Sequence, residues 1–263
     1  MQVKTRSSAV GRLLQQWRHA RQLSQLMLAG NARVSSRHLS FIESGRAAPS
    51  RDMILTLATA LDVPLRDRNQ LLLAGGFAPV YRETPLTDPV MAPVRDALER
   101  VLSHHEPYPA VVMDRYWNVL QANEAATAMF AFLLAGAPGS DQPNVVRLMF
   151  GPLRPYVSNF AEVGPALIQR AHRETIAGVL DPQTDALLTE VLALPGIPAS
   201  WRRADFTRPI LPVVPVRFER DAVAVSYFSM VTTVGTPQDV TSQEIRLESF
   251  FPMDDASVEH RWT

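Results

Sequence analysis

The sequence predicts two domains of different fold class, an all-α N-terminal bundle of five helices followed by an α+β domain. Residues 8–78 show apolar residues at helical spacing, interrupted by serine caps and glycine stops. β-forming residues gather late in the chain, at 211–218 and 222–233. The charge also changes sign along the chain: residues 1–82 hold 12 Lys/Arg against 4 Asp/Glu, a net charge of +8, and the remainder holds 14 against 22, a net charge of −8.

The composition limits the class of protein. A chain of 263 residues with 46% hydrophobic residues is long enough for two ordinary cores. Cysteine is absent, which excludes disulfides and thiolate metal sites. The sequence contains no apolar run of about 18 residues and no N-terminal apolar segment typical of a signal peptide. We therefore expect a cytoplasmic protein without a membrane span.

The first helix is expected at 8–21, with Leu13, Leu14 and Trp17 on its apolar side. Two shorter helices follow. Ser24 and Ser35 are suitable N-caps, because a serine hydroxyl accepts a hydrogen bond from an unpaired amide of the first turn.

The second of these short helices is expected at about 36–44, with Leu39 and Ile42 on its buried side and Gly45 as its left-handed stop. Two short helices joined by a tight turn form a helix-turn-helix. Fourth and fifth helices are expected after Ser50 and at 65–74, where Gly75 and Gly76 end the bundle.

The exposed side of the 36–44 helix carries hydroxyls, a cation and an aromatic ring, and no carboxylate before Glu43. This bias is typical of a helix that enters the major groove of DNA. The basic N-terminal part would also attract phosphates. Phe41 has a second interpretation, packing in a dimer or beneath the turn. The candidate DNA-binding residues are Gln25, Ser35, Ser36, Arg37, Ser40, Phe41, Arg46 and Arg51.

This region resembles the Cro/phage-repressor (XRE) type of helix-turn-helix. The resemblance is carried by the Ser-Gln opening at Gln25, the Val-Ser turn at Ser35 and the ending IESGRAAPS at 42–50. It implies binding to a double-stranded DNA operator and a structural ion pair between Arg18 and Glu43. The sequence departs from the pattern at two places, with Arg33 where glycine is usual in the turn and Leu26-Met27 where acids are usual.

Several later segments of the sequence resemble those of MmyB-like regulators, a bacterial group whose second domain is PAS-like and binds a small ligand. These segments are LRDRNQLLLAGGFAPVYRETPL at 65–86, HEPYPA at 105–110, WNVLQAN at 117–123 and VGTPQDVTSQEIRLESFFPMDD at 234–255. The expected organisation is a helix-turn-helix domain at 8–78, a proline-containing linker at 79–93 and a PAS-like domain at 94–257.

The second domain is expected to begin with a helix at 94–105, strands at 110–113 and 117–122, and a helix capped by Asn123. Strand, turn, strand and helix is the order in which PAS folds begin. Residues 144–150 read as an apolar helix or loop. Further helices are expected at 160–179 and 184–194, before the two late strands.

The implied PAS-like fold encloses a cavity, and the aromatic residues of this domain would suit a fatty acid or a similar apolar ligand. Each of them has a second interpretation as core. The candidate ligand-binding residues are Trp117, Phe130, Met149, Arg154, Tyr156, Tyr227 and Phe228, with Arg170 as a further candidate for a polar head group.

No catalytic constellation or cofactor motif is visible, so an enzyme is not expected. His104 and His105 are adjacent and point about 100° apart on a helix, so they cannot share one metal, and no metal site is expected. The prediction is a homodimeric DNA-binding regulator, because one short helix contacts too few bases for specificity. The alternative for the second domain is a protein-interaction or dimerisation module without a ligand.

Overall fold

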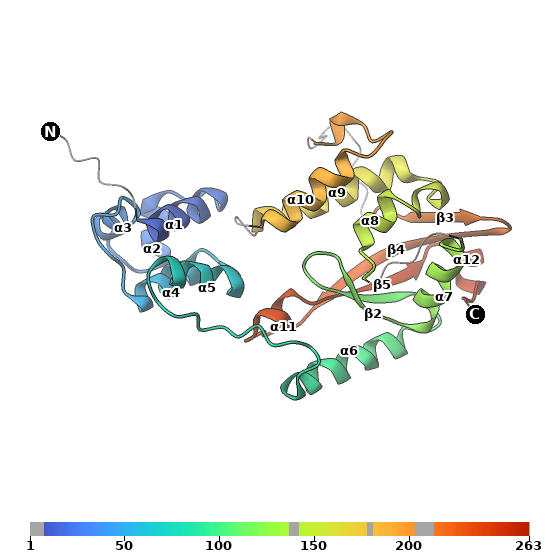
Figure 1. Ribbon diagram of the computed structural model, residues 1–263, viewed down its shortest axis with the longest axis horizontal. Helices are drawn as coiled ribbons and strands as arrows, with labels where there is room; N and C mark the ends of the chain where they lie inside the picture. Colours follow the sequence, from blue (N-terminus) through green and yellow to red (C-terminus); the bar gives the residue numbers. More distant parts are fainter. Residues whose placement is uncertain (1–7, 137–141, 178–180, 203–212, 263) are drawn as a thin grey trace. The chain divides into compact units, whose positions relative to one another are not determined.

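The computed structural model describes residues 8–136, 142–177, 181–202 and 213–262 (Figure 1). The chain divides into two compact units. The N-terminal unit comprises the chain through Glu83 together with the short segments Arg173–Asp181 and Gln238–Gln243, and the C-terminal unit comprises the rest. Each unit is described by itself below.

Residues 9–74 form five helices, which confirms the all-α N-terminal fold. Four of these helices begin after a serine whose hydroxyl accepts a hydrogen bond from the backbone amide three residues later, at 3.1–3.2 Å. Each such cap contributes about 1 kcal/mol. The helices are α1 (Ala9–Ala20), α2 (Gln25–Asn31), α3 (Ser36–Glu43), α4 (Arg51–Ala60) and α5 (Leu65–Ala74).

The fifth helix begins differently. Its N-cap is Pro64, which supplies no side-chain cap. The backbone amide of Leu65 instead donates to the side-chain oxygen of Gln243, at 2.6 Å. Gln243 lies in the short segment of the N-terminal unit that is most distant in sequence.

One core holds the five helices together. Leu14 and Trp17 of α1 are fully buried there, while Leu13 is only partly buried. Helix α1 also approaches α3 closely, because a β-carbon placed on Gly11 would lie 2.4 Å from the carbonyl oxygen of Ile42. Only glycine allows the two backbones this separation.

The predicted linker is not uniform. Its first part is held on α5, where the Asn69 side-chain amide donates to the carbonyl of Tyr81 at 2.7 Å and its oxygen accepts from the amides of Val80 and Tyr81. Its last part is already helical, since a 3₁₀ turn at Pro89–Met91 leads into the next helix.

The C-terminal unit is α+β, as expected. Its helices are α6 (Ala92–His104), α7 (Glu124–Leu133), α8 (Val145–Phe150), α9 (Phe160–Ala177), α10 (Pro182–Leu192) and α12 (Asp255–Glu259), with 3₁₀ turns at Arg154–Tyr156 and Ala199–Arg202. The end of α9, from Arg173, and most of α11 (Val240–Glu244) belong to the N-terminal unit. Its strands are β1 (Ala110–Met113), β2 (Val119–Ala122), β3 (Val216–Arg220), β4 (Val223–Thr233) and β5 (Arg246–Pro252).

The described strands form one antiparallel sheet in the order β2-β1-β5-β4-β3. Strand β5 lies at its centre and pairs with β1 through Val112 and Leu247, and with β4 through Thr232 and Leu247. No strand was expected at 246–252, although β5 joins the two hairpins of the sheet.

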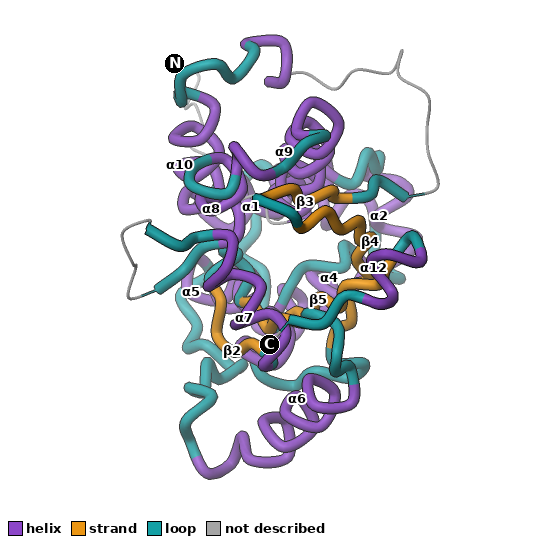
Figure 2. The backbone as a smooth tube through the Cα atoms, turned by 90° about the vertical axis from the view of Figure 1, so that its right-hand side faces the viewer, coloured by secondary structure: helices purple, strands orange, loops and turns teal. Residues whose placement is uncertain are grey.

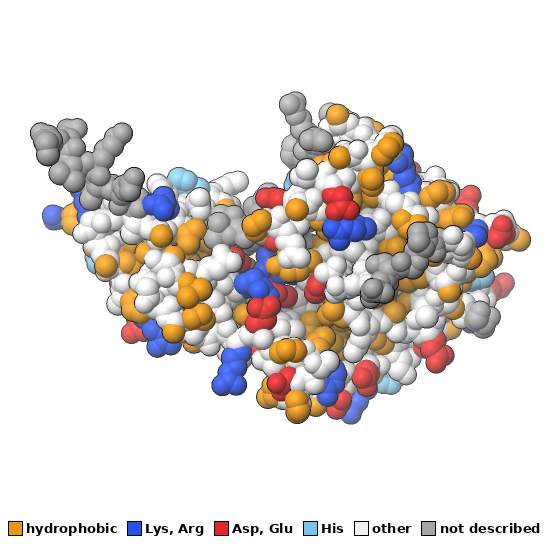
Figure 3. All heavy atoms as spheres, viewed as in Figure 1, with side chains coloured by type: hydrophobic (Ala, Val, Ile, Leu, Met, Phe, Trp, Pro, Cys, Tyr) orange, Lys and Arg blue, Asp and Glu red, His pale blue; other side chains and the backbone are white. Residues whose placement is uncertain are grey.

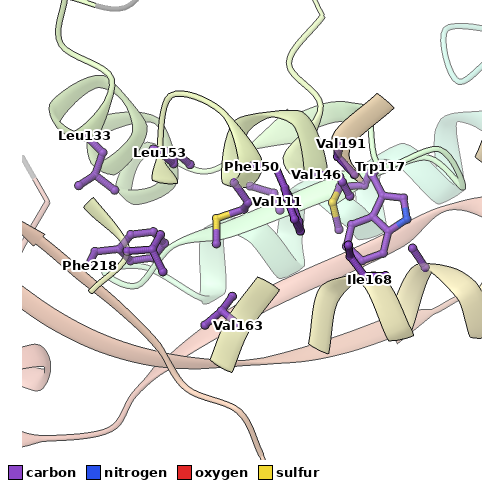
Figure 4. Packing of buried hydrophobic residues seen from close by; sticks show 14 of the residues in the cluster. Val111, Trp117, Leu133, Val146, Phe150, Leu153, Val163, Ile168, Val191 and Phe218 are labelled. Atoms are coloured by element: carbon purple, nitrogen blue, oxygen red, sulfur yellow. The ribbon is translucent and has the colours of Figure 1, made fainter. Parts of the chain in front are cut away.

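Helices cover the two faces of the sheet unequally. Helices α8, α9 and α10 lie over one face, and α6 lies over the other (Figures 1 and 2). The first face carries the large core, in which Val111, Trp117 and Phe150 from separate elements point into one cluster (Figure 4). The second face carries a small core that includes Val112 and Leu98. We call these the large-core face and the α6 face.

Two sequence expectations for this domain need correction. Trp117 lies in the turn before β2 with a φ of 68°, because the Asp114 carboxylate accepts hydrogen bonds from the amides of Tyr116 and Asn118 and closes that turn. The strand expected at 211–218 begins at Val216, and residues 211 and 212 lie outside the described residues. The 144–150 segment is a helix from Val145, capped by Asn144.

Candidate functional site

The turn between α2 and α3 fixes the geometry of the candidate DNA-binding surface. Arg33 adopts a left-handed φ of 55°, which an arginine rarely does and a glycine would adopt without strain. The amide of Val34 donates to the carbonyl of Ala29 at 2.9 Å and closes the turn. The turn geometry is therefore retained despite the unusual residue.

The exposed side of α3 begins with three exposed residues, Ser35, Ser36 and Arg37, and continues with the half-buried Ser40 and Phe41. The Ser35 hydroxyl is occupied by the amide of His38. Ser36 and Arg37 are exposed to solvent at the start of α3.

Phe41 lies between two guanidinium groups. The Arg37 guanidinium lies 5.4 Å from the centre of the Phe41 ring, and that of Arg46 lies 5.9 Å from it. Cation–π contacts at such exposed sites contribute about 0.5–1 kcal/mol each. Phe41 thus gathers two positive charges at the second half of α3.

A buried network holds α3 against α1 and α2. The Arg18 guanidinium donates to both carboxylate oxygens of Glu43, with each nitrogen to oxygen distance 2.8 Å, and to the carbonyl of Leu23 at 2.9 Å. Gln25 donates its side-chain amide to Glu43 at 2.8 Å. The hydrogen bond from Glu43 raises the pKa of Arg18. Gln25 therefore helps to hold α3 in place, in addition to being a candidate for DNA binding.

Two further candidate cations follow α3 in the sequence. Arg46 follows Gly45, whose φ of 75° ends α3, and Arg51 is the first residue of α4. Both side chains are exposed. Leu26 and Met27, at the start of α2, are also exposed, by 74% and 55%. The departures from the phage-repressor pattern therefore present apolar side chains to solvent in place of acids.

The candidate ligand-binding residues of the C-terminal unit do not share one surface. Trp117, Met149 and Tyr227 are buried in the large core, and Phe130 and Tyr156 pack against it. Phe228 follows Tyr227 in β4 and therefore points to the opposite face. There its ring stacks on that of Phe251 at 5.4 Å.

The two candidate arginines already have protein partners. Arg154 donates to the carbonyls of Pro195 and Gly196, at 2.7 and 3.0 Å. Arg170 lies 4.4 Å from the centre of the Trp117 ring and pairs with the Glu248 carboxylate at 3.1 Å. Glu248 is 6% exposed and also accepts from the Ser229 hydroxyl. Arg170 and Glu248 thus form a polar cluster at the edge of the large core.

Sequence reasoning missed Glu248 and Trp262. Glu248 lies in the unpredicted central strand β5. Trp262 donates its indole N–H to the Tyr227 hydroxyl at 3.1 Å, and burial raises the pKa of Tyr227. The buried Glu248 interrupts the apolar pattern of RLESFFP, so β5 has only a weak local signal, and the position of Trp262 has none.

Metal-ligating side chains do not gather into a site among the described residues, which include no group of three or more His, Asp or Glu that could hold a metal ion. The His105 ring is used structurally, since its Nε2 lies 2.8 Å from the carbonyl oxygen of Phe250. A membrane-crossing helix is not found in the part of the chain that the structure describes.

Comparisons with protein families assign both parts of the chain. The family model described as the MmyB-like transcription regulator ligand binding domain matches residues 94–261. A helix-turn-helix domain model matches residues 9–71. A search of curated proteins finds no match.

Proposed function

The chain belongs to the family of MmyB-like transcription regulators and is a DNA-binding regulator, and we propose that α3 reads a specific operator while the C-terminal unit responds to an apolar small molecule. We assign the helix-turn-helix to the XRE type and the C-terminal unit to a PAS-like fold. The opening of that unit, strand, turn, strand and helix, supports the second assignment.

The observation that carries the DNA proposal is the composition of the exposed side of α3. It presents Ser36 and Arg37 to solvent and gathers the Arg37 and Arg46 guanidiniums around Phe41. Hydroxyls and guanidiniums are the groups that bind phosphates and guanine edges in the major groove. The Arg18–Glu43 pair beneath this surface fixes the direction of the helix.

Gln25, Ser35, Ser40 and Arg51 complete the proposed contact surface, chiefly toward phosphates. A homodimer is proposed because the exposed surface of α3 is short, and two copies related by a twofold axis would read two half-sites. The proposed role is non-enzymatic and cytoplasmic, since a transcription regulator acts where its DNA is.

The test begins with selection of bound sequences from a random pool of double-stranded DNA by the full chain. A palindromic consensus is expected, with half-site centres about one helical turn apart. Fluorescence anisotropy then compares the wild type with Arg37→Ala, Ser36→Ala and the matched control Arg100→Ala, which removes the same charge from an exposed position of α6.

We expect each α3 variant to weaken operator binding by about 1–3 kcal/mol, as the loss of a base contact does. Arg100→Ala should leave it unchanged. Equal operator affinity in all four proteins would exclude α3 as the reading element.

The second candidate for the C-terminal unit is an interaction or dimerisation module without a ligand. Its support is the dense packing of the large core, where Trp117 and Tyr227 are buried to 1% and 0% exposure. Native mass spectrometry of the gently purified full chain distinguishes the two. A co-purifying apolar molecule supports a sensor, and a ligand-free dimer that still binds the operator supports the module.

A further inference from the structure

An apolar pocket lies on the α6 face of the sheet, away from the large core. Its volume is about 370 Å³, and its walls come from α6, from the end of β4 and from the start of β5. Leu98, Ile245 and Leu247 form its buried floor, at 8%, 2% and 3% exposure. Val101 stands at its mouth and is 44% exposed. We call this cavity the α6 pocket.

The pocket exists because α6 covers the sheet with short side chains at this point. Pro93, Val94, Ala97 and Val101 of α6 line the cavity beside Leu98, and their short side chains leave it open. The small core beneath α6 packs mainly on β1 and β5, through Ala110, Val112 and Leu247. The space over the end of β4 is left open. Figure 3 shows apolar side chains exposed among charged ones in the region of α6.

The chemistry of the walls selects the ligand. None of the described residues that line the pocket carries a charge, and Thr232 and Thr233 are the lining residues that have a polar side chain. A carboxylate taken into such a place would lose its hydration without an opposite charge, which costs several kcal/mol. Thr232 and Thr233 are exposed at the mouth, where a hydroxyl or ester keeps its hydrogen bonds, and no cation among the lining residues would hold a carboxylate there.

From this geometry we infer that the α6 pocket binds a neutral, mainly apolar molecule, and that occupancy is transmitted to the helix-turn-helix through α11. At about 30 Å³ for each water-sized group, the pocket holds roughly a dozen non-hydrogen atoms. This inference rests on the function proposed above. It adds where the small molecule binds and that this molecule is uncharged.

The transmission step follows from the order of residues along the chain. Val234 and Ile245 both line the pocket, and the segment between them contains Gln238–Gln243, which belongs to the N-terminal unit. Within that unit the amide of Val240 donates to the carbonyl of Arg82 at 2.8 Å, and Gln243 accepts from the amide of Leu65.

Gln243 thus supplies the hydrogen bond that Pro64 cannot supply to the first turn of α5. It stands two residues before Ile245 on the pocket floor. Only Glu244 separates Gln243 from Ile245, so a displacement of the backbone at Ile245 would be passed on to Gln243. Ligand occupancy and the start of α5 are therefore linked by covalent structure and one hydrogen bond.

The binding test uses 1-octanol and octanoate as probes of equal chain length, with the full chain at neutral pH and saturation-transfer NMR as the readout. Octanol should bind saturably and octanoate at least about tenfold more weakly, since the unpaired carboxylate is penalised. Ala97→Trp fills the pocket and should weaken octanol binding by about tenfold or more. Glu99→Trp places the same side chain on an exposed position of α6 outside the lining and should not.

Val101→Trp is a second filling variant at the exposed mouth, and thermal unfolding checks that each variant is folded. Octanol binding that survives both Ala97→Trp and Val101→Trp would overturn the site. Octanoate binding as tight as octanol binding would overturn the neutral-ligand assignment.

The transmission test measures operator affinity with and without octanol. A change of about fivefold or more is expected in the wild type, a coupling free energy at the low end of the usual range. In Gln243→Ala octanol should still bind, but operator affinity should no longer respond. An equal response in Gln243→Ala would overturn transmission through α11. Failure of octanol to bind a protein that still binds its operator overturns the pocket alone, whereas octanol binding without any operator overturns the DNA-reading proposal alone.

Discussion

Arg18 and Glu43 form a two-point ion pair between α1 and α3, with both nitrogen to oxygen distances 2.8 Å. The residues are only 6% and 4% exposed. Removal of one partner leaves a buried charge without compensation, so Glu43→Ala should lower the free energy of unfolding by about 3–5 kcal/mol. Urea denaturation followed by circular dichroism measures this loss.

The control is an ion pair of the same type at the surface. Arg147 and Glu190 also bond at 2.8 Å, but their side chains are 51% and 49% exposed. Glu190→Ala should cost no more than about 1 kcal/mol, because water screens the exposed pair. Similar losses of unfolding free energy in both variants would show that burial does not increase the contribution of the Arg18–Glu43 pair to stability.

Gly11 and Gly30 should respond oppositely to the same substitution. A β-carbon at Gly11 would lie 2.4 Å from the Ile42 carbonyl oxygen, whereas one at Gly30 would meet nothing within 4 Å. Gly11→Ala should therefore destabilise the fold by about 1–3 kcal/mol through overpacking. Gly30→Ala should stabilise it by about 0.5–1 kcal/mol, because alanine is the better helix former.

Thermal and urea unfolding of the two variants provide the comparison. Stabilisation by Gly11→Ala would mean that α1 can move away from α3 without loss of packing, contrary to the close approach seen here.

Local features of the fold could be predicted from the sequence because their causes are local. The caps Ser24, Ser35 and Ser50 act within three residues of themselves, and Gly45 ends α3 by its own φ. The Arg18–Glu43 pair could not be derived from spacing; it came from the resemblance to phage repressors, and both partners are in contact in the structure.

The central strand β5 could not be recognised as readily, because the contacts that stabilise it come from residues distant in the sequence. Glu248 occupies a buried position in β5, where an apolar residue would have given a clear strand pattern. Arg170 and Ser229, from α9 and β4, satisfy its carboxylate. Likewise, the alternation of Tyr227 and Phe228 to opposite faces becomes informative only when the sheet is known to be covered on both sides.

The stability of the C-terminal end should depend on pH through His260. Burial lowers the pKa of His260, and the neighbouring Arg261 lowers it further. The folded state therefore favours the neutral ring, while the unfolded chain takes up a proton near the ordinary value of about 6.5. The stabilising contribution is full above that pH and is lost as the pH falls toward the lowered pKa of the folded state.

His260→Phe should remove this dependence and keep a ring against Trp262, whose ring centre lies 4.4 Å from that of His260. The melting temperature measured from neutral to mildly acidic pH should fall less in His260→Phe than in the wild type. Parallel curves for the two proteins would assign the acid sensitivity to other groups.

Phe41 should determine operator affinity through the two arginines that flank it. Phe41→Leu keeps an apolar side chain but removes the aromatic face that holds Arg37 and Arg46 at 5.4 and 5.9 Å. At about 0.5–1 kcal/mol for each of the two contacts, operator affinity should fall roughly five- to thirtyfold. Phe41→Tyr retains the aromatic face and should bind nearly as well as the wild type.

Salt dependence separates this effect from the loss of a charge. Arg37→Ala should lower the slope of log K against log salt by about one, because one phosphate-neutralising cation is gone. Phe41→Leu removes no cation, so its slope should stay close to that of the wild type while its affinity falls at every salt concentration. If Phe41→Leu and Phe41→Tyr weaken binding equally, the ring does not act by positioning the arginines, and direct contact of Phe41 with a thymine methyl group or with a second subunit becomes the better account.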